Sequence, residues 1–212
     1  MSVLLQVIGG LARMPRDSGA EAGMLGRYTL LRKVPCGEPD ECWVATLEEH
    51  TKEQFVRTFA RERLTDPLID RLKRWMLLPV EGAAQLFDFG MVEHRPYLAS
   101  EHVHGIDLVR LKQRRPSLPI TLALLWEGLS ALDAIHASGE THGHLSEGRI
   151  RIQPLGVLRL CTGASELPGE ESRGKDLCTL ARLMLSASID DRELLALWDT
   201  NDEEALVVAC DR

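Results

Sequence analysis

The segment that decides the fold is ETHGHLSEGRIRI, residues 140 to 152. It follows a stretch, Ile120 to Ala137, in which apolar residues recur at helical spacing between Pro119 and a C-terminal stop at Gly139. This spacing predicts a helix that delivers the chain to a short loop rich in histidine and glycine. We expect one face of the helix to carry Leu122, Leu125, Trp126, Leu129, Leu132 and His136.

Downstream of the loop, two short apolar runs flank Pro154-Leu155-Gly156 and predict a small hairpin, Arg149 to Ile152 with Val157 to Leu160. A second helix is predicted from Asp176 to Ser186, where leucine and methionine recur at the same spacing. The C-terminal half is therefore expected to be mainly helical.

Upstream of Gly105, strand patterns prevail. A helix is predicted from Asp66 to Leu78, with Pro67 in its first turn and Pro79 at its end. Alternating or compact apolar runs predict five strands: Tyr28 to Val34, Cys42 to Leu47, Gln54 to Phe59, Ala84 to Phe89 and Pro96 to Val103. Strands first and helices second indicate an α+β protein of two lobes. We place a flexible, glycine-rich leader at residues 1–26, an N-lobe at 27–104 and a C-lobe at 105–212.

Composition narrows the class of protein. The chain has 212 residues, a formal net charge of -7 and 44% hydrophobic residues, enough for a folded core. Basic residues are scattered, so we expect no nucleic-acid partner. Five cysteines without a C-x-x-C pair favour a reducing cytoplasm over a disulfide framework or a zinc ribbon. The apolar N-terminus lacks a basic flank and is cut short by glycines, so neither a signal peptide nor membrane insertion is expected.

This order of elements and its landmark residues resemble the protein kinase family, most closely the bacterial Ser/Thr kinases, from Arg27 to Ser186. Residues 95 to 105 look like the fifth strand and hinge, and 132 to 142 like the helix and turn that lead to the catalytic loop. The resemblance implies a bilobal fold with a small antiparallel β-sheet N-lobe, one helix there, and a truncated, mainly α-helical C-lobe. It also implies structural roles for three residues: Asp176, which would support the backbone of the loop, His142 and Leu145.

The catalytic loop departs from the family where its chemistry lies. In the signature H-R-D-L-x-x-x-N, the Asp orients and deprotonates the acceptor hydroxyl and the Asn holds a magnesium ion. Here Gly143 stands at the Arg position, His144 at the Asp, Ser146 at the usual Lys and Arg149 at the Asn. The resemblance therefore implies that the base, the clamp and the metal ligand are all replaced.

The magnesium-binding D-F-G is replaced as well. Its equivalents are Thr162-Gly163-Ala164, or Cys161-Thr162-Gly163 if one residue is deleted, and neither contains a carboxylate. Magnesium needs hard oxygen ligands. A guanidinium at Arg149 would add a like charge where the ion would sit. Only residues 163 to 175 separate Thr162 from Asp176, too few for an activation segment, and no A-P-E is recognisable.

The nucleotide loop keeps one glycine of three, since Pro35, Gly37 and Asp40 fill the G-x-G-x-x-G positions. The strand-three lysine corresponds to Arg57, which keeps the charge but changes reach and geometry. Two residues are candidates for the helix glutamate that would pair with it: Glu62 and Asp70.

We therefore expect a catalytically inactive pseudokinase that serves as a protein-interaction or regulatory scaffold, with no cofactor and no metal. One alternative is a nucleotide sensor that works without metal through Gly37, Arg57, Glu101 and Val103. Another is an atypical phosphoryl or nucleotidyl transferase that uses His144 as its base. A metal site at His136, His142 and His144 is a further alternative, although the kinase frame already accounts for His136 and His142.

The expected partner is a protein: an active kinase, a multiprotein signalling or secretion complex, or a second copy of the chain. The apolar residues of the leader are candidates for a docking helix, and a disordered tail is the equal alternative: Val3, Leu4, Val7, Ile8 and Leu11.

Overall fold

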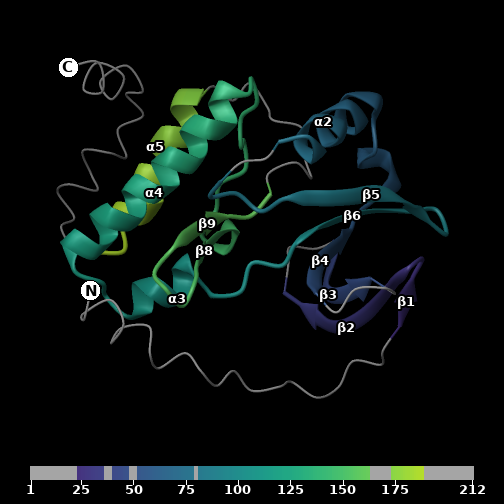
Figure 1. Cartoon of the computed structure of the whole chain (residues 1–212), viewed down its shortest axis with the longest axis horizontal. Coiled ribbons are helices and arrows are strands. Elements are labelled where there is room, and N and C mark those ends of the chain that lie inside the picture. Colours follow the sequence, from purple (N-terminus) through teal and green to yellow (C-terminus); the bar gives the residue numbers. More distant parts are fainter. Residues whose placement is uncertain (1–22, 36–39, 48–51, 79–80, 163–172, 189–212) are drawn as a thin grey trace.

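The computed structural model describes residues 23–35, 40–47, 52–78, 81–162 and 173–188, arranged as a sheet-rich N-terminal part beside a helical C-terminal part (Figure 1). The docking helix considered for the leader lies outside these residues. The N-terminal part is built on a six-stranded antiparallel sheet of order β1-β2-β3-β4-β6-β5. Its strands are β1 (Met24–Leu25), β2 (Tyr28–Val34), β3 (Glu41–Leu47), β4 (Glu53–Thr58), β5 (Leu86–Val92) and β6 (Arg95–Glu101).

All five predicted strands are present in this sheet, within a few residues of their expected bounds. The prediction was wrong at β1, which lies inside the expected leader and pairs with β2 through Met24↔Thr29 and Leu25↔Tyr28. A two-residue strand is too short to show an alternating pattern, and Gly26, at φ 58°, supplies the turn that folds it back onto β2. The N-terminal lobe therefore begins before residue 27.

The connection between β5 and β6 is shorter than the stretch Gly90 to Arg95 that separates the two predicted strands. Only Glu93 and His94 lie between the strands, and both have positive φ, 47° and 67°. Positive φ at both central residues is typical of the type I′ hairpin turn. Type I′ turns favour Asn-Gly, so the Glu93-His94 pair did not indicate such a turn in the sequence.

Helix α2 (Asp66–Met76) follows a short 3-10 turn, η2 (Arg61–Arg63), and packs against β5. Pro67 stands in its first turn, as predicted. Its buried side chains recur at i, i+3, i+4 and i+7, which makes one continuous face: Leu68, Arg71, Leu72 and Trp75.

Within the described residues, the C-terminal part contains three α-helices and a three-stranded sheet of order β7-β8-β9. Two of its elements, β7 and α3, were not predicted, and α3 begins where the Asp107 side chain accepts a hydrogen bond from the N–H of Arg110. The elements are β7 (Ile106–Asp107), α3 (Leu108–Gln113), α4 (Leu118–Ala137), η3 (Glu147–Arg149), β8 (Ile150–Ile152), β9 (Leu158–Leu160) and α5 (Arg173–Leu185).

Helix α4 forms where it was predicted and buries Leu132 and His136 of the predicted face, but the rest of that face is only partly right. Leu122 and Trp126 are exposed, at 48% and 73%, whereas Leu124, Gly128 and other residues are buried. The cause is the tight contact with α5, since a side chain at Gly128 would come within 2.9 Å of the Leu180 methyl. By length and composition, α4 alone among the described helices could cross a membrane, and here it packs against α5 and β9.

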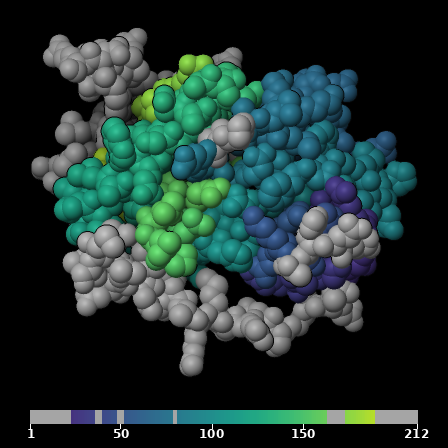
Figure 2. Space-filling model, viewed as in Figure 1, coloured from purple at the N-terminus to yellow at the C-terminus, as the bar shows by residue number. Residues whose placement is uncertain are grey.

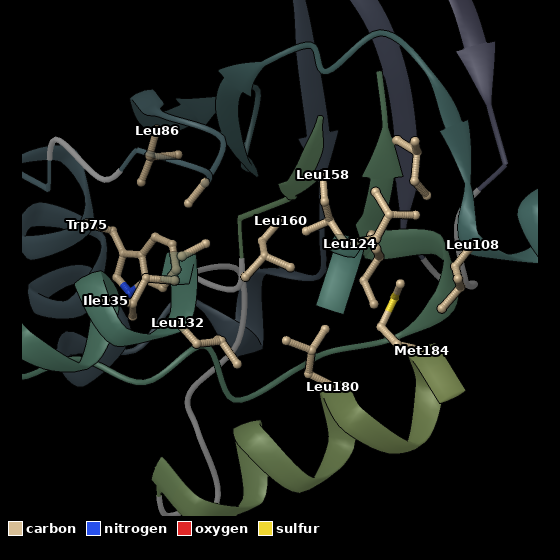
Figure 3. Close-up of a cluster of buried hydrophobic side chains, with 14 of the residues drawn as sticks. Trp75, Leu86, Leu108, Leu124, Leu132, Ile135, Leu158, Leu160, Leu180 and Met184 are labelled. Atoms are coloured by element: carbon tan, nitrogen blue, oxygen red, sulfur yellow. The ribbon is translucent and has the colours of Figure 1, made fainter. Parts of the chain in front are cut away.

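One hydrophobic cluster spans both parts. Trp75 and Leu86 of the N-terminal part point toward Ile135 and Leu160 of the C-terminal part (Figure 3). Backbone bonds reinforce the contact, because the N–H of Ala84 donates to the carbonyl of Leu160 and the N–H of Leu160 donates to that of Gly82. The space-filling view shows the two parts touching (Figure 2). They therefore share a core, which fixes the loop at residues 140–149 relative to the sheet.

Candidate functional site

The loop that follows α4 is supported by one buried carboxylate from α5. Asp176 is 3% exposed, and its Oδ2 accepts from the N–H of His142 at 2.7 Å while Oδ1 accepts from the N–H of Gly143 at 2.8 Å. The ring Nε2 of His136, at the end of α4, donates to the same Oδ2 at 2.9 Å. Three donors on one carboxylate fix α4, α5 and the loop to one another. Gly143 has φ 77°, a conformation that a glycine adopts without strain.

His142 is fully buried beneath this loop. Its Nε2 donates to the carbonyl of Cys161 at 2.8 Å, just after β9, and its ring meets Trp75 edge-on with centroids 6.2 Å apart. Burial lowers the pKa of His142 to about 4, so the imidazole is neutral at pH 7. Its Nδ1 is then free of a proton and accepts from the N–H of His144 at 3.4 Å. The structure thus places His142 in the packing of the loop.

Helix α2 holds the loop from the other side. Arg71 is 1% exposed, and its Nη2 donates to the carbonyls of Thr141 at 2.7 Å and His142 at 3.1 Å. One turn later, Arg74 forms an ion pair with Glu140. Neither contact was predicted from the sequence. The signal was available for Arg71, because it falls on the same helical stripe as Leu68 and Trp75.

In the loop, the residues that the resemblance aligns with the catalytic residues of kinases have side chains poorly suited to that chemistry. His144 is half-buried and supplies an imidazole, Ser146 is exposed, and Arg149 ends η3 with a half-buried guanidinium. Leu145 packs against the core. The next carboxylate along the loop, Glu147, is ion-paired with Lys112 of α3. An imidazole can accept a proton, but neither it nor a guanidinium replaces the oxygen ligands that magnesium needs.

At the sheet, Arg57 of β4 is paired with Asp40, which directly precedes β3. Its Nε donates to Asp40 Oδ2 at 2.7 Å, and its Nη2 reaches the same oxygen. Arg63 of η2 adds bonds of 2.8 and 3.0 Å to the two carboxylate oxygens. The Asp40 side chain is only 2% exposed, so two guanidinium groups enclose it. The sequence placed Asp40 in the nucleotide loop, and its pairing with Arg57 was not predicted.

The two candidates for a glutamate partner of Arg57 lie elsewhere. Asp70 forms an ion pair with Lys73 on the exposed side of α2, at 3.1 Å. Glu62 is exposed in η2. The role of charge partner to Arg57 is taken by Asp40, which comes from the strand side rather than from α2.

The connecting segment after β6 is also tied down. Glu101 accepts from Arg159 Nη2 of β9 at 2.7 Å, and the same Nη2 donates to the carbonyl of Ala83 at 2.8 Å. Val103 is 5% exposed and Thr162 is 8% exposed. Gly37, Gly163 and Ala164 lie outside the described residues. Of the predicted site residues, the structure therefore joins His142, Gly143 and Asp176 directly, and it gives Arg57 and Glu101 separate ionic partners.

The histidine cluster considered for a metal is accounted for in part by these bonds. His136 donates to Asp176 and His142 donates to the Cys161 carbonyl. Among the described residues, the ligand atoms of His136, His142 and His144 do not form a group close enough to hold one ion.

No protein-family model matches the chain. In sequence it is similar to the serine/threonine-protein kinase PknA of Mycobacterium tuberculosis and of Mycobacterium bovis, at 29% identity over 147 residues in each case. That match takes in 64% of this chain and 34% of PknA, so the chain spans about a third of the relative's length.

In structure the chain is similar to the kinase domain of Mycobacterium tuberculosis PknI. One crystal structure of that domain gives a TM-score of 0.64 at 19% identity, covering 84% of this chain and 81% of that chain. A second gives 0.66 at 18% identity, covering 82% and 79%.

Proposed function

We propose that this chain, which has a protein kinase-like fold and is related to the bacterial serine/threonine kinases, is a pseudokinase that acts as a protein-interaction scaffold in bacterial signalling. The observation that carries the proposal is the enclosed ion pair of Arg57 with Asp40. By the resemblance, Arg57 stands where the phosphate-gripping lysine belongs. Its guanidinium pairs with Asp40, which by the resemblance fills a phosphate-loop position, so a carboxylate stands where the nucleotide phosphates would bind and repels them.

The loop adds a second line of support. The positions of the catalytic base and of the metal-binding amide are filled by His144 and Arg149. Each such replacement is expected to cost orders of magnitude in rate, and a cation in the metal position also repels Mg²⁺. Loss of the base, the metal ligand and the free phosphate-gripping cation in one chain supports a role that does not depend on phosphoryl transfer.

The framework beneath that loop is nevertheless maintained. Asp176 and Arg71 bind the loop backbone through buried, charge-assisted hydrogen bonds, and the His142 side chain ties the loop to the Cys161 carbonyl after β9. Such bonds fix the shape of a surface whether or not the surface is catalytic. A fixed, kinase-like shape without phosphoryl transfer is what a scaffold requires, and the partner class we propose is a protein, with an active kinase as the first candidate.

The metal-independent nucleotide sensor and the His144-dependent transferase remain different functions for the same site. The Arg57–Asp40 pair weighs against the sensor, because the Asp40 carboxylate would repel a phosphate that approaches Arg57. The transferase would need an acceptor and a metal that neither His144 nor Arg149 helps to hold.

Phosphate transfer is the test of inactivity. The chain would be incubated with ATP labelled at the γ-phosphate, with Mg²⁺ or Mn²⁺ and a generic protein acceptor, beside a His144→Ala variant as the matched blank. We expect equal, background label in both. Label that is present in the wild type and lost in His144→Ala would contradict the proposal and support the transferase.

The scaffold role has its own test. The rate of an active bacterial Ser/Thr kinase would be measured with increasing amounts of this chain, in the wild type and in an Asp176→Asn variant whose loop support is weakened. We expect a saturable change in rate or substrate preference that the variant shifts to higher concentration. A rate that never responds to either protein would count against the active-kinase partner, independently of the result on phosphate transfer.

A further inference from the structure

Three side chains with metal-binding atoms meet at the edge of the sheet, away from the kinase-like loop. Glu53 begins β4, and His102 and His104 follow the end of β6. His102 Nε2 lies 3.7 Å from Glu53 Oε2, and His104 Nε2 lies 3.9 Å from the same oxygen. The ligand atoms of all three residues lie within 4.8 Å of one another.

Strand register explains why these residues converge. In the antiparallel pair of β4 and β6, Gln54 lies opposite Glu101, so Glu53 and His102 are the next positions outward on the two chains. His104 is two residues beyond His102, and side chains two apart in extended backbone point the same way. The two rings accordingly stand edge to face, with centroids 4.5 Å apart.

The groups are chemically suited to an ion. Desolvation, then the neighbouring His104 and two arginines, lower the pKa of His102 to about 4, so its ring carries a lone pair at neutral pH. The His102 side chain is 14% exposed and is therefore held in place, while Glu53 and His104 are exposed enough to move toward a bound metal ion. A tetrahedral zinc site with bonds of about 2.0–2.1 Å separates its ligand atoms by roughly 3.3 Å. Movements of about half an ångström would bring Glu53 to that spacing from each histidine.

Two cations face the cluster and must be considered. Arg32 Nη2 lies 3.4 Å from His102 Nε2, on an exposed side chain of β2. The charge of Arg151 in β8 also lowers the pKa of His102, and Arg151 Nη1 lies 3.9 Å from Asp107 Oδ2. Because Arg32 is exposed, it can withdraw into solvent when an ion takes its place. It acts as a competitor whose removal should strengthen metal binding.

We propose that Glu53, His102 and His104 bind a divalent transition-metal ion, with Zn²⁺ as the best match to a two-imidazole, one-carboxylate ligand set. Water would complete the coordination. This site is independent of the pseudokinase proposal, since it uses neither the loop nor Arg57. A bound ion would clip the start of β4 to the segment that joins the two parts of the chain, and so would restrict the angle between them.

The test is a titration of the untagged, full-length chain with Co²⁺, whose visible absorption reports a tetrahedral site, followed by displacement with Zn²⁺. We expect saturation at one ion per chain. Glu53→Gln and His104→Gln each remove a direct ligand and should weaken the affinity for the metal ion by about 100-fold or more. Loss of a residue that only hydrogen-bonds to a metal ligand already costs up to about 100-fold. Arg32→Ser should tighten it.

A matched control replaces a histidine outside the cluster. His94 is exposed in the β5–β6 turn at φ 67°, a conformation that asparagine tolerates, so His94→Asn should bind as the wild type does. Binding that is unaffected by both ligand variants, binding with a thiolate charge-transfer band, or no saturable binding at all would each overturn the proposal.

Discussion

Arg57 and Asp40 form an ion pair whose carboxylate is 2% exposed, although the resemblance to kinases places the first at the phosphate-gripping position and the second in the phosphate loop. The pair joins two groups that a nucleotide site would keep apart. Arg63 completes it from η2. The same contact therefore stabilises the sheet and occupies the cation on which phosphate binding would depend.

Asp40→Asn should destabilise the fold by about 2 kcal/mol, because two guanidinium groups lose a charged partner in a partly buried setting. Chemical denaturation measures the free energy of unfolding. The control is Asp70→Asn on α2, an exposed pair with Lys73 that should change it by no more than about 0.5 kcal/mol. Equal effects of the two substitutions would contradict the importance given to the Asp40 pair.

Asp176→Asn should cost about 3 kcal/mol. The new amide NH₂ group would face backbone N–H groups and the His136 ring, which are all donors, so at least one buried donor loses its acceptor. Asp133→Asn on the exposed side of α4 is the matched control and should be nearly neutral. Equal stability of the two variants in thermal or chemical unfolding would contradict the supporting role of Asp176.

Stability should fall as the pH is lowered from about 7 toward 4. The pKa of His142 is about 4 in the fold against an ordinary 6.5, so the unfolded chain takes up the proton first. The stability associated with neutral His142 is fully present above the pKa of the unfolded chain and is lost as the pH falls toward the pKa in the fold. The free energy of unfolding then falls by up to about 1.4 kcal/mol per pH unit for one proton.

The check on this pH dependence is the free energy of unfolding at several pH values, with chelator present, in the wild type and in His142→Gln. The slope between pH 6.5 and 4 should be shallower in the variant. His102→Gln gives a second comparison, because burial lowers the pKa of His102 to about 4 as well. Identical slopes in all three proteins would refute the assignment of the proton uptake to these rings.

Truncation to alanine should destabilise the fold strongly at Trp75 of α2 and hardly at all at Trp126 of α4. Trp75 is 3% exposed within the core shared by the two parts, and Trp75→Ala should cost about 3–5 kcal/mol. Trp126 is 73% exposed on α4, and Trp126→Ala should stay within about 0.5 kcal/mol. A large loss at Trp126 would mean that this face of α4 is covered in solution. The measurement is equilibrium unfolding of both variants.

Much of the fold could be predicted because its elements carry local signals. The β2–β3 hairpin, α2 and α4 follow from alternating or helical spacing together with prolines and glycines at their ends. The buried face of α4 could not be predicted in this way, since the helix is apolar around most of its circumference and the choice depends on where α5 approaches Gly128.

In the candidate site, too, some residues could be predicted from the sequence and others could not. The kinase frame drew attention to Asp176 and His142 because both stand at landmark positions in the sequence. The ion pairs Arg57–Asp40 and Glu101–Arg159 join residues far apart in the chain, and only strand register and the packing of β9 bring them together. The cluster of Glu53, His102 and His104 is likewise invisible until β4 is paired with β6.

The melting temperature of the chain with and without millimolar ATP, each with and without Mg²⁺, tests most directly whether the kinase-like fold has lost its nucleotide chemistry. A ligand at about 100 times its dissociation constant stabilises by about 2.7 kcal/mol. For a domain of this size that corresponds to a rise of roughly 5–10 °C. We expect no Mg²⁺-dependent rise in the wild type. A Mg²⁺-dependent rise of that size, lost in an Arg57→Ala variant, would contradict it.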